Sequence, residues 1–185
     1  QNGVAGFILA NGALSGGGEE YKIRKKLIEN DLVEAILVLP MKMFYTTDIS
    51  VTLWILNANK KERTFEQNNI TKIHRDRTNE ILFMDLRKLG VAFEKKFIQF
   101  DTETIEKISS TYHTWQSDKE AYEDIAEYCK SATLSEVIAK DYSLVPSKYI
   151  EFVNRDENID FDTKMTALQS EFVELLKEEE KSKQE

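Results

Sequence analysis

The sequence predicts an α/β fold in which a mixed sheet, with an antiparallel strand near its edge, precedes a helical C-terminal region. Apolar runs of strand length at residues 4–10 and 32–39 flank a segment, 19–30, whose apolar side chains repeat at helical spacing. A third apolar run at residues 49–56 follows the second too closely for a helical crossover, so it should run antiparallel to its neighbour. Beyond residue 100 the chain is acidic, and its apolar residues recur mainly at helical spacing.

The first elements follow one another as strand, helix and strand. The first apolar run ends in Asn11-Gly12, which is typical of a stop. The helix at 19–30 begins with two glutamates and carries its basic cluster later, an order that suits the helix dipole. The second run is apolar throughout except for Glu34, as expected of a strand covered on both faces. This order predicts a right-handed crossover in a mostly parallel sheet.

The rest of the chain predicts shorter elements. Residues 57–79 are polar and charged, so we expect a solvated loop with a short ordered piece around 65–73. The chain as a whole is predicted to divide into two regions, an α/β part at residues 1–100 and a helical part at 101–185. The further predicted elements are a strand at 81–86 and helices opening at 101, at 119–129, at 134–139 and from about 162 to the end.

The charge of the chain limits the classes of function. The net charge of −8 divides into +3 for residues 1–100 and −11 for residues 101–185. An acidic chain is a poor candidate for binding DNA phosphates by itself, although the first half can line one wall of a larger nucleic-acid cleft. The acidic half is more typical of protein-facing or solvated helices. No apolar run reaches the roughly 18 residues that a membrane-spanning helix needs, so no membrane role is expected.

Candidate metal and nucleophile sites are weak. Cys129 is the single cysteine, which excludes an internal disulfide, and its helical setting favours a small buried hydrophobe over a nucleophile. His74 and His113 lack a ligand spacing, so no metal site is expected. The glycines at 16–18 precede a helix, but no Gly-Lys-Ser/Thr follows and two glutamates occupy the place of a phosphate. A flexible entry loop is the favoured interpretation.

The loop at residues 40–49 is the most unusual segment. It joins two buried strands without a glycine and carries Phe44-Tyr45 beside Thr46-Thr47, whereas a tight hairpin would use Asn-Gly or Asp-Gly. In one interpretation Phe44 plugs the core at a strand end while Tyr45 caps it. In the other, the aromatics bind a ligand, because loops at strand ends often carry binding residues.

The ordered series of segments resembles one enzyme family. This family is the modification subunit of type I restriction-modification systems, an adenine-N6 DNA methyltransferase. The resemblance covers roughly residues 3–152 and implies the C-terminal part of a Rossmann-like methyltransferase sheet. The matching segments are 3–15, 23–29, 33–36, Leu39-Pro40 with 44–49, and 53–56, with later landmarks at 82–87 and 142–150.

The resemblance also implies where chemistry lies. Such enzymes take the adenine out of the duplex and hold it by stacking. The loop at 40–49 then lies beside the target-base pocket, with Phe44 contacting the adenine and Tyr45 or Thr47 as neighbours. The family's Asn/Asp-Pro-Pro-aromatic loop and glycine-rich cofactor loop have no match here. We therefore expect a piece of a longer protein that is inactive alone. S-adenosylmethionine would serve the full-length enzyme, this piece would bind none, and it would hold no catalytic residue.

The partners that the resemblance implies are DNA, the specificity subunit and the restriction subunit of the same system, in the cytoplasm. The apolar stripe of the tail helix would pack on the specificity subunit, or alternatively on the chain's own core. A second class of function also stands, a non-catalytic protein-interaction module on a Rossmann-like scaffold. The stripe consists of Met165, Leu168, Phe172 and Leu175.

Overall fold

The computed structural model describes residues 2–67, 69–117, 121–153 and 160–184. The chain divides into two compact units, Gln1–Phe152 and Val153–Glu185. Residues from the second half of the sequence therefore share the first unit with residues 1–100.

The first unit is built on a five-stranded sheet of order β1-β3-β2-β6-β9. β2 and β6 pair in parallel, whereas the other three pairings are antiparallel. The predicted mixed α/β sheet with an antiparallel strand is confirmed, but the mostly parallel pairing is wrong. The reason is that β3 returns directly from β2 and inserts between β1 and β2, which run in the same direction without pairing. The strands are β1 (Val4–Ala10), β2 (Val33–Val38), β3 (Val51–Asn57), β6 (Glu80–Asp85) and β9 (Cys129–Thr133).

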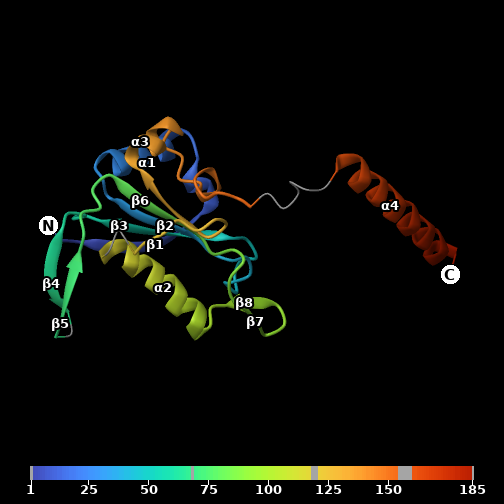
Figure 1. Ribbon diagram of the computed structural model, residues 1–185, viewed down its shortest axis with the longest axis horizontal. Helices are drawn as coiled ribbons and strands as arrows, with labels where there is room; N and C mark the ends of the chain where they lie inside the picture. Colours follow the sequence, from blue (N-terminus) through green and yellow to red (C-terminus); the bar gives the residue numbers. More distant parts are fainter. Residues whose placement is uncertain (1, 68, 118–120, 154–159, 185) are drawn as a thin grey trace. The chain divides into compact units, whose positions relative to one another are not determined.

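Helices cover both faces of this sheet (Figure 1). One face carries α1 (Gly18–Glu29), α3 (Leu134–Ala139) and the 3-10 turns η1 (Asn11–Leu14) and η2 (Pro146–Lys148), and the other carries α2 (Thr102–Ser117). All six residues of β2 are buried, and four of them belong to two hydrophobic clusters, Val33 and Ile36 to one and Ala35 and Leu37 to the other. This confirms the prediction of a strand covered on both sides, because side chains alternate along a strand.

Two hairpins stand beside the sheet where the sequence predicts little regular structure. β4 (Arg63–Gln67) pairs with β5 (Ile70–His74) inside the expected loop at 57–79. β7 (Val91–Phe93) pairs with β8 (Phe97–Gln99) in a segment for which no element was predicted. Hairpins with mixed polar and apolar faces have no continuous apolar run, so hydropathy alone does not reveal them.

The predicted helix at 119–129 is wrong. Residues 121–128 form turns and irregular structure with an isolated bridge at Ile125, Glu127 has a positive φ of 59°, and Cys129 begins β9. Residues 118–120 lie outside the described part of the chain. The apolar residues have helical spacing, yet pairing of β9 with β6 completes the sheet, so tertiary pairing overrides the local pattern.

The second unit contains α4 (Phe161–Gln184), in the segment where the sequence predicts a tail helix. Asp160 begins it, because its side chain accepts a hydrogen bond from the Thr163 amide at 3.2 Å. Within the described residues, no helix combines the length and the apolarity needed to cross a membrane.

Candidate target-base site

The carboxyl ends of β1, β2 and β6 meet at one edge of the sheet. Ala10 pairs with Val51, and Val38 lies between Thr52 and Asp85 in the register, so the ends of these strands are neighbours. The loop at residues 40–49 leaves the sheet at this edge. In open α/β sheets, ligands bind outside the carboxyl ends of the parallel strands.

Short hydrogen bonds close this loop at its base. The Leu39 amide donates to the Val51 carbonyl at 2.8 Å, and the Ser50 hydroxyl donates to the Leu39 carbonyl at 2.5 Å. Further out, the Lys42 amide donates to the Asp48 carbonyl at 3.3 Å. The loop therefore has a defined geometry rather than the character of a flexible connection.

The structure places the three predicted pocket residues in different environments. Phe44 is partly buried and packs against the hydrophobic cluster under α2, as the core-plug interpretation expects. The ring of Tyr45 is 72% exposed. Thr47 is partly buried, closes a turn by donating its amide to the Phe44 carbonyl at 3.4 Å, and accepts the Ile49 amide at its hydroxyl. The loop thus exposes the ring of Tyr45 to solvent, while the neighbouring ring of Phe44 packs against the core.

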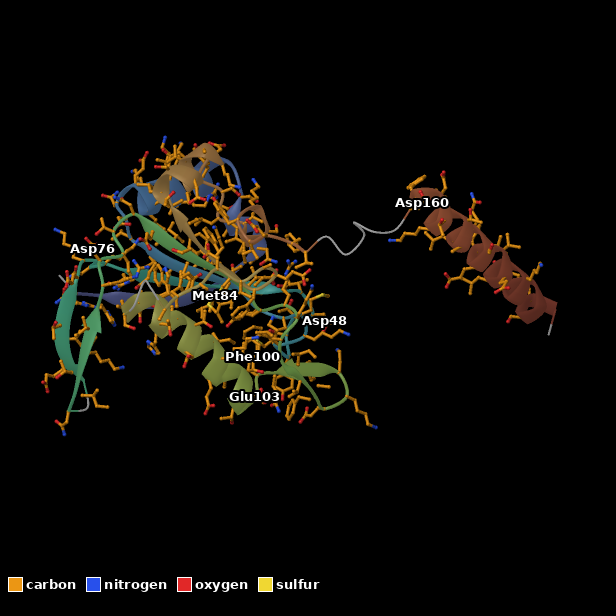
Figure 2. The ribbon with its side chains drawn as sticks, in the orientation of Figure 1. Asp48, Asp76, Met84, Phe100, Glu103 and Asp160 are labelled. Atoms are coloured by element: carbon orange, nitrogen blue, oxygen red, sulfur yellow. The ribbon has the colours of Figure 1, made fainter. Side chains whose placement is uncertain are left out.

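The β7–β8 hairpin lies against this loop, a contact that no local pattern in the sequence predicts. The rings of Tyr45 and Phe97 meet edge to face with centroids 4.7 Å apart. The label of Phe100, which follows β8, and that of Asp48 in the loop locate this region in Figure 2. A signal was present, since the apolar run Val91–Phe93 comes just before a charged turn, but three-residue strands are too short for pattern recognition.

A hollow of 390 Å³ opens at the same edge of the sheet, on the face that carries α1. Asn11, Val38, Arg87 and Pro146 are among the residues that line it. Arg87 is bound by Asp85, at 2.9 Å through Nε and at 2.5 Å through a terminal nitrogen. This ion pair raises the pKa of Arg87. It also occupies the Asp85 carboxylate at the end of β6.

The described residues offer no metal centre, since no group of three His, Cys, Asp or Glu side chains among them is arranged to hold an ion. Cys129 is buried, and burial raises the pKa of its thiol. A thiol held in its neutral form is a poor nucleophile, which agrees with the interpretation of Cys129 as a buried hydrophobe.

A buried charged cluster lies at the opposite edge of the sheet. Arg77 and Glu34 are both fully buried and their Nε and Oε1 atoms are 3.1 Å apart. Asn57 and Gln116 donate to the same carboxylate at 2.6 and 3.1 Å. Nearby, burial and then the charge of Arg77 lower the pKa of His74 to about 4, so this ring is neutral at neutral pH. The cluster joins β2, β3 and α2 and serves the fold rather than a ligand.

Comparison with known proteins adds relatives to this geometry. Residues 1–158 match the N-6 DNA methylase family. The chain is 37% identical over 180 residues to the type I restriction enzyme HindI methylase subunit of Haemophilus influenzae. This alignment covers 96% of this chain and 36% of that protein. It is 33% identical to the MjaIX methylase subunit of Methanocaldococcus jannaschii, over 97% of this chain and 30% of that protein. The chain thus spans about a third of the length of these relatives.

Solved structures agree with the fold. The type I restriction-modification methyltransferase subunit of Streptococcus thermophilus superposes with a TM-score of 0.64 at 27% identity, over 80% of this chain and 27% of that chain. The EcoKI M protein superposes with a TM-score of 0.56 over 96% of this chain and 39% of that chain, and at 14% identity it supports the fold alone. The match over residues 1–158 confirms the resemblance seen in the sequence: the chain belongs to the N-6 DNA methylase family.

Proposed function

We propose that this chain is part of the modification subunit of a type I restriction-modification system, a cytoplasmic enzyme that transfers a methyl group from S-adenosylmethionine to adenine N6 in DNA. The chain supplies part of the catalytic sheet and one wall of the target-base pocket. The observation that carries this proposal is the closed loop at residues 40–49, which holds adjacent aromatic rings at the carboxyl edge of the sheet. Family membership and the type I relatives favour this function over a non-catalytic interaction module.

In the proposed pocket the aromatic loop holds the flipped adenine. Stacking of a base on an aromatic ring is worth roughly 1–3 kcal/mol, which is comparable to the few kcal/mol needed to unstack it. Phe44 provides the stacking face, and its packing against the core keeps the ring from turning away. Tyr45 and Thr47 flank it, with Tyr45 exposed and Thr47 partly buried beside the base.

The free edge of the sheet supports the role of a partial catalytic domain. β1 is an edge strand, and its Val4 and Ile8 side chains are 60% and 48% exposed. An apolar hollow of 300 Å³ lined in part by Phe7, Ile23 and Trp54 opens beside it. Proteins normally cover apolar edge strands, because an open edge invites uncontrolled pairing. We assign this surface to a further strand and helix of the longer subunit.

We propose that the site for S-adenosylmethionine lies in the longer subunit, outside this chain. A nucleoside cofactor uses an acidic side chain at a strand end to bind its ribose hydroxyls. Asp85 ends β6, but Arg87 already binds both of its oxygens. The cofactor and the methyl transfer therefore belong to residues of the longer subunit outside this chain.

Calorimetric titration tests whether the cofactor site lies outside this chain. We expect the isolated chain to show no binding of S-adenosylmethionine at micromolar concentration, whereas the full-length subunit binds it and methylates DNA. Circular dichroism of the isolated chain provides the control for folding. Micromolar binding by the chain alone would show that it contains the cofactor site.

The α4 helix is the proposed contact with the specificity subunit. Its apolar residues Phe161, Met165, Leu168, Phe172 and Leu175 alternate at spacings of four and three, the heptad pattern by which helices pack in coiled coils. The four predicted interface residues are between 44% and 62% exposed. A solved structure described as concerning complex assembly of the type I system has the same fold. We place the restriction subunit in the same assembly, and DNA as its substrate.

Charge placed in the stripe tests this contact. Leu168→Asp with Phe172→Asp should weaken association of the full-length subunit with the specificity subunit at least about 30-fold, because a hot-spot residue contributes about 2 kcal/mol or more. Thr166→Asp with Ser170→Asp puts the same two charges on the opposite side of α4 and should leave association unchanged. Co-purification and surface plasmon resonance measure the effect. Equal behaviour of the two variants would assign the stripe to packing within the chain.

A further inference from the structure

The β7–β8 hairpin is fastened to the loop at residues 40–49. Its two strands have three residues each, and an isolated hairpin of this size is not stable in water, so its position depends on these contacts. The contacts are the Ile98 amide donating to the Lys42 carbonyl (3.0 Å), the edge-to-face rings of Tyr45 and Phe97 (4.7 Å between centroids) and the ion pair of Lys96 with Asp48 (3.9 Å).

The hairpin and the loop carry an excess of positive charge. The loop at residues 40–49 and the hairpin at residues 91–99 hold three basic and two acidic side chains, in a chain whose net charge is −8. Lys42 and Lys95 are exposed and have no ion-pair partner among the described residues. Lys96 is also exposed, and its long ion pair with Asp48 is worth at most about 1 kcal/mol at such a surface. We call Lys42, Lys95 and Lys96 the lysine set.

Two of these lysines lie in the left-handed backbone conformation that is typical of turns. Lys95 lies in the hairpin turn with a φ of 60°, and Lys42 has a φ of 59° where the loop leaves the sheet. A hollow of 200 Å³ lies between loop and hairpin, and its walls are about half polar and half apolar. Its lining residues are Met43, Tyr45, Phe93, Phe97, Ile98 and Gln99.

Exposed lysines around aromatic side chains match the chemistry of a nucleic-acid strand. Lysines bind phosphates and position the duplex, while aromatic faces contact bases or sugars. We propose that the β7–β8 hairpin binds the DNA strand beside the target adenine, with the lysine set on successive phosphates and the Tyr45–Phe97 pair against the adjoining nucleotide. This inference rests on the proposed function, because the loop must be the one that receives the flipped base. It adds a DNA-contacting element that the family assignment does not supply.

Salt-dependent DNA binding tests the hairpin. The sample is the full-length subunit in complex with its specificity subunit, and the probe is a duplex carrying its mapped methylation site. Changing Lys42, Lys95 and Lys96 to Gln should weaken binding and reduce the slope of log K against log salt by about 3, one for each lost phosphate contact. Changing the same three residues to Arg should restore the slope. The control is Lys26→Gln with Lys61→Gln, which removes exposed lysines from α1 and from the segment after β3.

The outcomes separate this inference from the proposed function. A slope reduced by the Gln variant, restored by the Arg variant and unchanged in the control supports the hairpin contact. An active complex whose slope is the same in wild type and Gln variant overturns the hairpin contact alone. A wild-type complex that neither binds nor methylates DNA overturns the proposed function and the hairpin contact together.

Discussion

Replacing Phe44 by alanine in the full-length subunit is expected to lower kcat/KM for DNA methylation about 5- to 150-fold, the range that corresponds to 1–3 kcal/mol of lost base stacking. The target adenine would still leave the duplex, but the open state would lose the surface that stabilises it. Transfer of a labelled methyl group to a duplex carrying the methylation site measures the rate. Fluorescence of 2-aminopurine at the target position reports the flipped state directly.

A second substitution separates stacking from core packing. Phe44 packs against the cluster under α2, so alanine also removes buried apolar surface. Phe44→Leu keeps most of that volume and loses the aromatic face. If stacking is the function of Phe44, the leucine variant should melt near the wild-type temperature and methylate as poorly as the alanine variant. Wild-type activity in the leucine variant would make Phe44 a core residue and leave Tyr45 as the aromatic contact.

Replacing Arg77 by methionine is expected to lower the free energy of unfolding by about 3–5 kcal/mol. The variant leaves the Glu34 carboxylate fully buried without its cation, and removal of one partner of a buried ion pair has this cost. Urea unfolding of the chain measures this loss of stability. The signal is the fluorescence of Trp54 and Trp115, which are both buried in the sheet unit.

An exposed ion pair provides the matched control for this experiment. Lys22→Met breaks the pair with Glu19, in which the two side chains are 66% and 80% exposed, and should cost less than about 1 kcal/mol. The double variant Glu34→Leu with Arg77→Met should lose less stability than the two single variants combined, because no uncompensated charge stays buried. A loss below about 1 kcal/mol in Arg77→Met alone would contradict the structural role of the cluster.

Local patterns were informative where one element meets a simple environment. The apolar run of β2 predicted a strand buried on both faces, because both of its faces meet helices or loops. The short helix at 134–139 agrees with α3, whose start is a capping box formed by Thr133 and Glu136. The same reasoning failed at 119–129, where apolar residues at helical spacing lie in an irregular segment that leads into the edge strand β9.

The candidate site also has one part that the sequence predicts and another that it does not. The adjacent aromatics of the loop and its place between two buried strands could be read from the residues, and they led to Phe44, Tyr45 and Thr47. The hairpin against this loop could not, because the Tyr45–Phe97 contact joins residues from two segments far apart in the chain. Nor does any local pattern indicate that Arg77 lies beside Glu34, since both residues are ordinary surface types in sequence.

The sequence by itself thus determined the α/β class, the buried strand β2, the helices α1 and α3, and the family through the order of its short motifs. The tertiary structure alone decided the insertion of β3 between β1 and β2, the addition of β9, and the meeting of loop and hairpin. The physical reason is that hydrophobic periodicity reports only which face of an element is buried. Which elements bury one another depends on non-local pairing, in which hydrogen bonds and packed side chains from distant segments must be satisfied together.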